Sequence, residues 1–398
     1  MDGFSFEYHP GSIEFGRGCL DRLETTLETL SIARPLVVCG STVGSTPAVI
    51  DTVTDAIGDR LVGVFDETSA EKSFRTAVEG CERVRAEDVD GLVSLGGGSS
   101  LDVAKAITIL EATDRSAQEV ESFIRANGAL PIPAGDLLPI VSIPTTLAGA
   151  DLSAVGSVTL PEAASGLTAD GDHHVGGFGD ARVMPDALFY APPLFATTPD
   201  HVLNASAMNG FDKGIELLYS RNATPITDAT AKHGLGLLRP ALPSMTADRS
   251  ALEEAIVGTI LVQYGLSTPG TGKLSLIHAF GHGLARHYPV QQGAAHGIVA
   301  PAVLEYVFDQ VDGRRTEIAD GLDLAVDGTV AAEAIVEAVA ELRDDLGLPD
   351  RLRGVDGLDP DAFPDLAAFI LEDGIMRNRP PGLEPTQSDI EGVLESLW

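Results

Sequence analysis

A run of glycines between a β-rich segment and a helical segment constrains the fold of this chain more than any other feature. Residues 91–95 are mostly apolar and typical of a buried strand, and they lead directly into Gly96-Gly97-Gly98-Ser99-Ser100-Leu101-Asp102-Val103-Ala104-Lys105. Glycines at such a turn let the main chain approach a phosphate group closely, and the free N–H groups at the start of the following helix favour an anion. The segment therefore predicts a parallel α/β domain with a phosphate-binding loop.

Further strand-like runs alternate with helical stretches in the first half of the chain. Besides residues 91–95, the predicted strands are residues 35–39, 61–65 and 138–144. Strands separated by helices indicate a parallel sheet covered on both faces. A segment rich in Gly, Asp and His over 165–180 predicts a hairpin or a loop.

The second half of the chain has a different character. Thr198-Pro199-Asp200 has the features of a helix start, with a capping hydroxyl, a proline at the first position and an acid in the first turn. Helical periodicity then continues to Trp398. We therefore predict a Rossmann-like, dinucleotide-binding α/β domain over residues 1–190 and an all-α catalytic domain over residues 195–398.

Length and composition agree with a folded, two-domain protein. The chain has 398 residues, more than a single core of about 250–300 residues accommodates, and 44% of them are apolar. No apolar run is long enough to span a membrane, and the acidic first residues lack a signal-peptide pattern, so we expect a cytoplasmic protein. Cys19, Cys39 and Cys81 show no metal-binding or redox spacing and are expected to be ordinary buried residues.

The net charge of −33 excludes several kinds of partner. Nucleic acids and anionic membranes require basic surfaces, so neither is expected to bind. Only five lysines occur in the chain, whereas acidic residues are spread along it. A strongly acidic surface with a normal apolar content is typical of a folded protein that functions at high salt, where self-repulsion is screened.

The complete glycine motif resembles the GGGSxxDxxK signature of the iron-containing alcohol dehydrogenase superfamily, which has a dehydroquinate synthase-like fold. The resemblance extends over nearly the whole chain through residues 12–16, 143–149 and 184–190. Within the superfamily, the pattern is most similar to maleylacetate reductases. That narrower likeness is carried by three stretches, at residues 145–153, at residues 207–209 followed by 216–219, and at residues 222–226.

The resemblance implies a set of cofactor-binding residues for NAD or NADP. The residues it assigns to the dinucleotide are Gly96, Gly97, Gly98, Ser99, Asp102, Thr145, Thr146 and Gly40. Thr145 and Thr146 correspond to threonines that line the nicotinamide side. Gly40 stands where family members often carry an Asp that binds the adenosine ribose, and the absence of that carboxylate permits NADP. His173 and His174 stand near a position where family members often carry a cofactor-contacting lysine.

The family's metal site is altered in this sequence. The residues that match its four metal ligands are Asn209, Lys213, His278 and Gln292. An amide is a weak ligand and a protonated lysine is none, so one good ligand remains and we expect the divalent metal to be absent. We predict that Lys213 replaces the ion electrostatically and that His278 or His282 hydrogen-bonds the substrate oxygen and relays the proton.

The resemblance thus predicts an NAD(P)-dependent dehydrogenase or carbonyl reductase that acts on a small carbonyl or alcohol and forms a homodimer or a larger homo-oligomer. Two alternatives remain open: a catalytically silent NAD(P)-binding protein, and a non-redox synthase on the same scaffold. His287 and His296 are weaker site candidates. The remaining histidines, His9, His201 and His233, are interpreted as structural or exposed.

Overall fold

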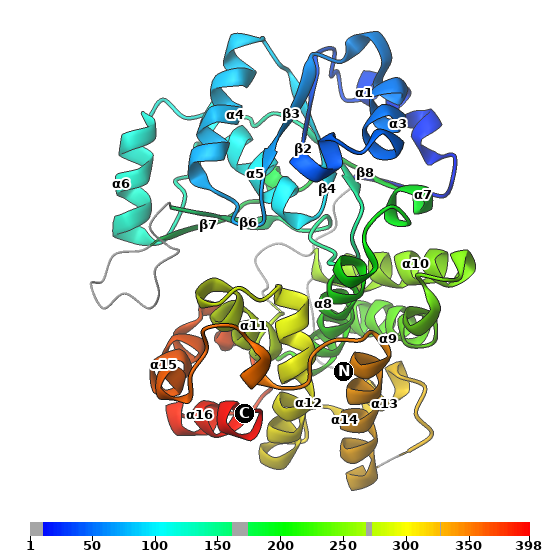
Figure 1. Ribbon diagram of the computed structural model, residues 1–398, viewed down its shortest axis with the longest axis vertical. Helices are drawn as coiled ribbons and strands as arrows, with labels where there is room; N and C mark the ends of the chain where they lie inside the picture. The colour runs from blue at the N-terminus through cyan, green and yellow to red at the C-terminus, as the bar shows by residue number, and fades with distance from the viewer. Residues whose placement is uncertain (1–10, 161–173, 268–272, 327) are drawn as a thin grey trace. The chain divides into compact units, whose positions relative to one another are not determined.

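The computed structural model describes residues 11–160, 174–267, 273–326 and 328–398, and this part of the chain divides into two compact units (Figure 1). The α/β unit contains the described residues up to Thr146 and those from Ala150 to Thr198. The helical unit contains Pro199–Trp398 and also the short segment Leu147–Gly149. His9 and His173, for which the sequence analysis made predictions, lie outside the described residues.

A six-stranded parallel sheet forms the centre of the α/β unit, with the strand order β1-β8-β5-β4-β2-β3. The strands are β1 (Ser12–Phe15), β2 (Pro35–Gly40), β3 (Gly63–Thr68), β4 (Gly91–Gly96), β5 (Ile140–Pro144) and β8 (Ala187–Tyr190). The helices of this unit are α1 (Leu23–Thr29), α2 (Ser41–Gly44), α3 (Pro47–Ile57), α4 (Phe74–Ala86), α5 (Gly98–Glu111), α6 (Ala117–Asn127) and α7 (Pro192–Phe195), with the 3₁₀ turns η1 (Cys19–Arg22), η2 (Gly58–Arg60) and η4 (Ala181–Val183).

The sheet is buried on both faces, as its apolar strands predict. Alternate residues of a strand point to opposite faces, so Leu36 and Val38 of β2 join one core cluster while Val37 joins the other. The first cluster includes residues of α4, α5 and α6, and the second includes residues of α1 and α3. This is the doubly covered parallel sheet that the sequence predicts.

A small hairpin accompanies the sheet. Strands β6 (Val155–Thr159) and β7 (Val175–Gly179) pair antiparallel and form a separate two-stranded sheet. Residues 165–173 of the predicted hairpin or loop region lie outside the described residues. The hairpin matters for the site because α5 packs against β6.

The helical unit contains no strand among its described residues. Its helices are α8 (Asp200–Tyr219), α9 (Pro225–Ala241), α10 (Arg249–Leu266), α11 (Leu276–His287), α12 (Gln292–Gln310), α13 (Arg315–Gly321), α14 (Gly328–Asp345), α15 (Phe363–Glu372) and α16 (Gln387–Ser396), with the 3₁₀ turns η5 (Leu242–Ser244), η6 (Leu352–Gly354), η7 (Pro360–Ala362) and η8 (Gly374–Asn378). Helix α8 packs against α9, α10 and α12, and α11 packs against α12. The fold class predicted from the sequence is confirmed.

Three local predictions need correction. The strand predicted over residues 61–65 is β3, which begins two residues later, at Gly63, and continues to Thr68. The strand predicted over residues 138–144 is β5, which also begins two residues later, at Ile140. The hydroxyl of Thr198 does not cap α8; it donates to the carbonyl of Thr145 at 2.8 Å, and Pro199 stands at the N-cap. The local pattern correctly predicted that a helix begins near Asp200. The Thr198 hydroxyl, however, makes a tertiary hydrogen bond instead of capping that helix.

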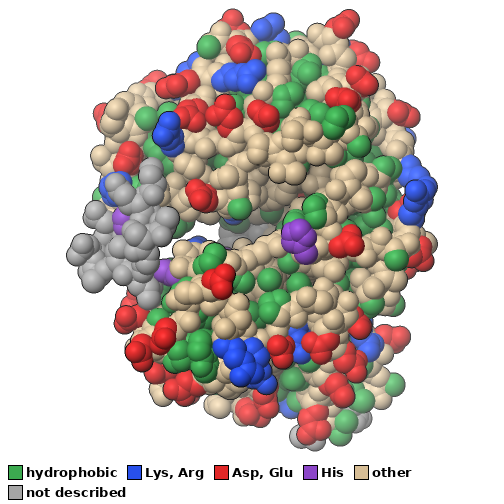
Figure 2. Space-filling model, in the orientation of Figure 1, with side chains coloured by type: hydrophobic (Ala, Val, Ile, Leu, Met, Phe, Trp, Pro, Cys, Tyr) green, Lys and Arg blue, Asp and Glu red, His purple; other side chains and the backbone are tan. Residues whose placement is uncertain are grey.

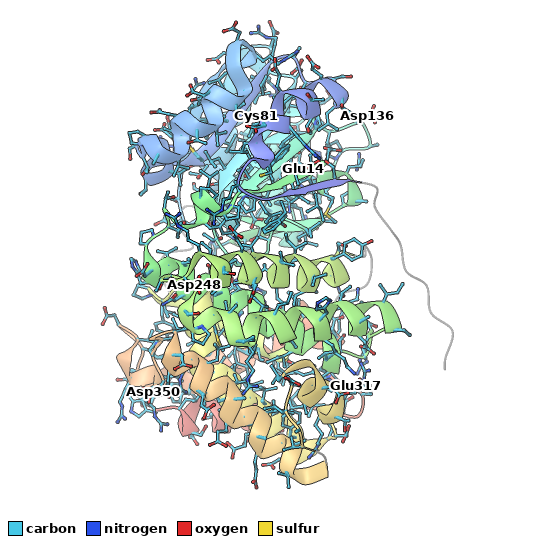
Figure 3. The ribbon with its side chains drawn as sticks, turned by 90° about the vertical axis from the view of Figure 1, so that its right-hand side faces the viewer. Glu14, Cys81, Asp136, Asp248, Glu317 and Asp350 are labelled. Atoms are coloured by element: carbon cyan, nitrogen blue, oxygen red, sulfur yellow. The ribbon has the colours of Figure 1, made fainter. Side chains whose placement is uncertain are left out.

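Acidic side chains are scattered over the visible surface rather than gathered in one patch (Figure 2). Glu14, Asp136 and Asp248 of the α/β and helical units, labelled in Figure 3, illustrate this spread along the chain. The three cysteines are buried and unpaired, as predicted. In the described part of the chain, every helix is too short or too polar to cross a membrane.

Candidate active site

The glycine loop has the geometry of an anion-binding helix start. Gly96 ends β4 with φ of 130°, a value that favours glycine, and Gly97 is the N-cap of α5 without a side-chain cap. A Cβ on Gly97 would lie 3.4 Å from the Thr146 side chain, and one on Gly98 would lie 2.9 Å from the Cβ of Ala150. The uncapped N–H groups at the start of α5 therefore face a narrow cradle that suits a pyrophosphate.

The charged residues of the same motif have protein partners. Asp102 is 6% exposed, and its Oδ2 accepts from Lys72 Nζ at 2.7 Å and from the Ser157 N–H at 3.4 Å. Lys105 is fully buried and donates to the carbonyls of Ser153 and Val155 at 2.6 and 3.0 Å. Burial lowers the pKa of Lys105 to about 8. These contacts tie α5 to the hairpin, and cofactor contact by Asp102 stays a prediction.

The other predicted cofactor residues of the α/β unit lie at strand ends. Thr145 follows β5, and its N–H donates to the carbonyl of Gly96 at 3.0 Å, so it lies beside the glycine loop. Gly40 ends β2, where a Cβ would lie 3.2 Å from the carbonyl of Thr68. A carboxylate is nevertheless close to this strand. Burial raises the pKa of Cys39 in β2 to about 12, and the negative charge of Asp66 in β3 contributes to this rise.

In the helical unit, two glycines allow close packing around the predicted site, one against a backbone carbonyl and one against a side chain. A Cβ on Gly210 of α8 would lie 2.3 Å from the carbonyl of Leu147. A Cβ on Gly281 of α11 would lie 2.2 Å from Nε2 of His296 on α12. Larger residues would push these elements apart, so the glycines determine how near the functional side chains come to one another.

Lys213 lies in the interior of the helical unit and not on its surface. Its side chain is 8% exposed, and Nζ donates to the carbonyls of Ala148 and Gly149 at 2.7 and 3.0 Å. The segment 147–149 is held on α8 a second time, because the N–H of Leu147 donates to Ser206 Oγ at 3.0 Å. Lys213 is thus an interior cation that donates to two main-chain carbonyls.

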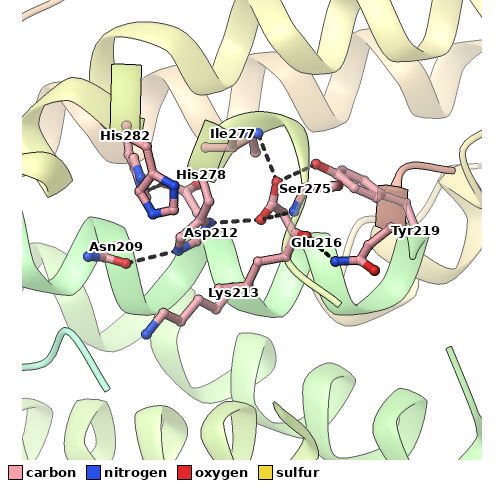
Figure 4. A network of polar contacts seen from close by, with 12 residues as sticks. Asn209, Asp212, Lys213, Glu216, Tyr219, Ser275, Ile277, His278 and His282 are labelled. Carbon is pink, nitrogen blue, oxygen red and sulfur yellow. Dashed lines mark hydrogen bonds and ion pairs between the residues drawn. The ribbon is translucent and has the colours of Figure 1, made fainter. Parts of the chain in front are cut away.

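His278 is held from both ring nitrogens. Its Nδ1 lies 2.7 Å from Oε2 of Glu216, and its Nε2 lies 3.1 Å from Oδ1 of Asn209 (Figure 4). Both partner atoms are acceptors, and a neutral ring donates from one nitrogen only. Burial lowers the pKa of His278 well below its usual value, and the nearby His296 and Lys213 lower it further. The ring is therefore neutral at physiological pH and fixed in orientation.

Glu216 is the residue that organises this network. It is fully buried, and besides His278 it accepts hydrogen bonds from the Tyr219 hydroxyl at 2.7 Å and from the N–H groups of Ser275 and Ile277 at 3.0 and 2.8 Å. Four donors on two oxygens favour the carboxylate form, while burial raises the pKa of this residue. The sequence analysis included Glu216 in a stretch similar to maleylacetate reductases but predicted no role in the site for it, although it lies on the same helix face as Asn209 and Lys213.

A second buried acid lies beside this network. Asp212 and His296 are both fully buried, with Oδ2 and Nδ1 3.4 Å apart, and the ring centroid of His296 is 4.4 Å from that of His278. Neither Asp212 oxygen has a hydrogen-bond partner within the described chain. Burial, and then Glu216, raises the pKa of Asp212 well above its usual value, and burial lowers the pKa of His296 to about 3. Burial thus favours the uncharged form of both side chains.

His282 lies one turn beyond His278 on α11, and its environment differs. Its Nδ1 lies 2.8 Å from Oδ2 of Asp373, and its side chain is 25% exposed. The ring centroids of His278 and His282 are 6.5 Å apart. The weaker candidate His287 has a structural role, because its Nδ1 lies 2.7 Å from the Gly283 carbonyl and its ring packs on Phe369. His201 and His233 are exposed, as expected.

The residues at the family's metal-ligand positions do not fit a divalent ion. The ammonium of Lys213 has no lone pair to offer, and it already donates to two carbonyls. Of the remaining groups, Oδ1 of Asn209 lies 3.1 Å from Nε2 of His278, so these two atoms contact each other. Among the described residues, no group of three or more His, Cys, Asp or Glu side chains could hold a metal ion. We therefore derive no catalytic step through a metal.

Comparison with known proteins assigns the family. Residues 10–192 match the family model for iron-containing alcohol dehydrogenase, and residues 204–398 match the model for the C-terminal part of the Fe-containing alcohol dehydrogenase family. The chain belongs to the iron-containing alcohol dehydrogenase family. The resemblance inferred from the GGGSxxDxxK motif is thereby confirmed.

Curated relatives in this family are oxidoreductases. The chain is 27% identical to the lactaldehyde reductase of Escherichia coli K12 over 390 residues, which is 96% of this chain and 97% of the relative. It is also 27% identical to a maleylacetate reductase of Pseudomonas aeruginosa over 306 residues, 76% of this chain and 75% of the relative. These equal identities support an oxidoreductase of this family without selecting one substrate.

The fold is shared with solved structures. A sulfoacetaldehyde reductase from Bifidobacterium kashiwanohense, solved in complex with NAD+, superimposes with a TM-score of 0.84 at 22% identity and covers 99% of each chain. At this identity the comparison establishes the fold alone.

Proposed function

We propose that this protein is an NAD(P)-dependent oxidoreductase that interconverts a small carbonyl compound and its alcohol without a bound metal, with Lys213 in place of the ion. The observation that carries the proposal is the interior ammonium of Lys213 at a position where the family has a metal ligand. A bound dinucleotide supplies the hydride. Family membership, the glycine cradle and the NAD+ complex of the fold neighbour support its binding.

The role of Lys213 follows from the charge that develops in the reaction. When a carbonyl is reduced, negative charge builds up on its oxygen, and a fixed positive group stabilises that charge if it needs no reorganisation. Lys213 is held by two carbonyls and is one of the groups that lower the pKa of His278 and His296, which places its charge close to both rings. A metal ion would serve as a Lewis acid in the same role.

The experiment measures NADH and NADPH oxidation by the purified protein at high and low salt against a panel of small aldehydes, hydroxyaldehydes and oxo acids. Metal content is determined on the same sample, and turnover is repeated after treatment with a chelator. We expect turnover with far less than one zinc or iron per chain, unaffected by the chelator. Stoichiometric metal with chelator-sensitive turnover would contradict the role of Lys213. Cofactor binding without turnover on any carbonyl would instead favour a catalytically silent cofactor-binding protein.

A further inference from the structure

Two histidines of α11, His278 and His282, each contact a carboxylate through Nδ1. The two pairs differ in whether Nε2 of the ring also has a protein partner. His278 is 2% exposed, and both of its ring nitrogens have protein partners, Glu216 and Asn209. His282 uses only Nδ1, on Asp373, and its Nε2 has no hydrogen-bond partner among the described residues. Of the two rings, only His282 has a nitrogen left for a substrate.

Asp373 is itself fixed in position. It precedes η8 and caps it, because its Oδ1 accepts from the N–H of Ile375 at 3.1 Å. Its side chain is 9% exposed, and Arg286 Nη1 lies 3.9 Å from Oδ2. Burial raises the pKa of Asp373, but the hydrogen bond from His282 and the charges nearby outweigh it, so the net shift is downward. Asp373 is therefore an ionised carboxylate that only accepts hydrogen bonds.

An ionised carboxylate on Nδ1 determines the tautomer of the ring. Nδ1 of His282 must carry a proton to donate to Asp373, so the lone pair of the neutral ring is on Nε2. The carboxylate also stabilises the positive charge of the ring when Nε2 takes up a second proton. The other titratable or charged groups near His282 are Arg286 and His278 on its own helix and His296 on α12.

We propose that Asp373 is a positioning residue that orients His282, and that Nε2 of His282, not of His278, exchanges the proton with the substrate oxygen. This inference rests on the proposed function. During reduction, the carbonyl carbon gains the hydride as the reduced cofactor is oxidised. The O–H bond of the product alcohol then forms with the proton of Nε2, whose N–H bond breaks, and neutral His282 keeps its Nδ1 proton on Asp373. Because His282 is partly exposed, water returns the proton, and alcohol oxidation follows the reverse course.

The first test is Asp373→Asn in the full-length protein. Asparagine keeps the size of the side chain and an oxygen that can cap η8, but it no longer forces the Nδ1 proton. We expect kcat to fall by about 10²-fold, within the range typical of lost acid–base catalysis. The KM for the cofactor should stay within twofold, and the solvent deuterium isotope effect on kcat should rise as proton transfer becomes rate-limiting. The matched control is Glu372→Gln, which removes one negative charge from the exposed neighbour of Asp373 and should retain wild-type kinetics.

A double-mutant cycle with His282→Gln separates positioning from a purely structural role. If Asp373 acts through His282, the double variant should lose no more kcat than His282→Gln alone. Additive losses, or a kcat for Asp373→Asn within twofold of the wild type, would overturn the inference while wild-type NAD(P)H oxidation still upheld the proposed function. Absence of wild-type oxidation would refute the proposed function first.

Discussion

The glycine loop of the α/β unit and the carboxylate–histidine network of the helical unit use different physical means to build a site. The loop acts through its main chain, and the charged residues of its motif, Asp102 and Lys105, are occupied by local partners. The network acts through side chains whose ionisation depends on burial, as for Glu216 and His278. A backbone site tolerates changes in nearby charge but not in volume, whereas a buried ionic site is sensitive to both.

The largest expected effect concerns the charge in the helical unit. Lys213→Met keeps the length of the side chain and removes the ammonium, so turnover should fall by about 10²–10³-fold, or roughly 3–4 kcal/mol. NAD(P)H affinity, measured by fluorescence titration, should hardly change because the predicted site of the dinucleotide phosphates is the glycine loop. Lys232→Met, which removes a lysine paired at the surface with Glu317 and Asp320, is the control. Near-normal turnover of Lys213→Met would exclude Lys213 from the mechanism.

The second prediction tests the backbone site by volume. Gly97 has φ of −88°, so valine is not excluded by backbone strain, but its side chain would fill the cradle beside Thr146. Gly97→Val should weaken cofactor binding by about 5- to 150-fold, the equivalent of about 1–3 kcal/mol of overpacking, with little change in melting temperature. Gly135→Val, in the same unit with open space around it, is the control. Undiminished NAD(P)H binding by Gly97→Val would mean that the pyrophosphate lies elsewhere.

The third prediction applies the same volume test to the helical unit. Gly281→Ala would place a Cβ against the His296 ring and should destabilise the protein by about 1–3 kcal/mol in chemical denaturation. Gly392→Ala, on α16 with nothing within 4 Å, should be neutral or stabilising by about 0.5–1 kcal/mol. Equal stabilities of the two variants would show that α11 and α12 need not approach so closely.

The smallest effect concerns the pH dependence of stability. Because the pKa of Asp212 in the folded protein is raised above its ordinary 3.8, the folded state holds this proton longer than the unfolded state. Its contribution therefore weakens as pH rises above about 4. Asp212→Asn removes that dependence, so its stability relative to the wild type should increase between pH 4 and pH 8.

The measurement is the free energy of unfolding of both proteins across that range, with exposed Asp350→Asn as the control for losing one carboxylate (Figure 3). A variant that becomes less stable than the wild type as pH rises would show that Asp212 is ionised in the fold. His296 has the opposite dependence, because its depressed pKa costs stability as pH falls from about 6.5 towards 3. Because the two dependences overlap between pH 4 and about 6.5, the contribution of Asp212 is taken from the difference between the variant and wild-type curves, measured in parallel.

The sequence by itself determined the parallel α/β unit, the helical second half and the glycine loop, because these follow from periodicity and from residues close together in the chain. It also determined that Asn209 and Lys213 share a helix face, since four residues make about one turn. It could not determine which groups face them. Glu216 is 62 residues from His278, and Asp373 is 91 residues from His282.

Only the tertiary structure decided the protonation and orientation of the site. Helical periodicity indicates which face of a helix is buried but not which partner covers it, and an exposed and a buried carboxylate look alike in a sequence. The desolvation that raises the pKa of Asp212 and lowers that of His296 arises when α8 and α12 pack together. Close packing, permitted at α11 by the missing side chain of Gly281, is what turns a set of polar residues into this network.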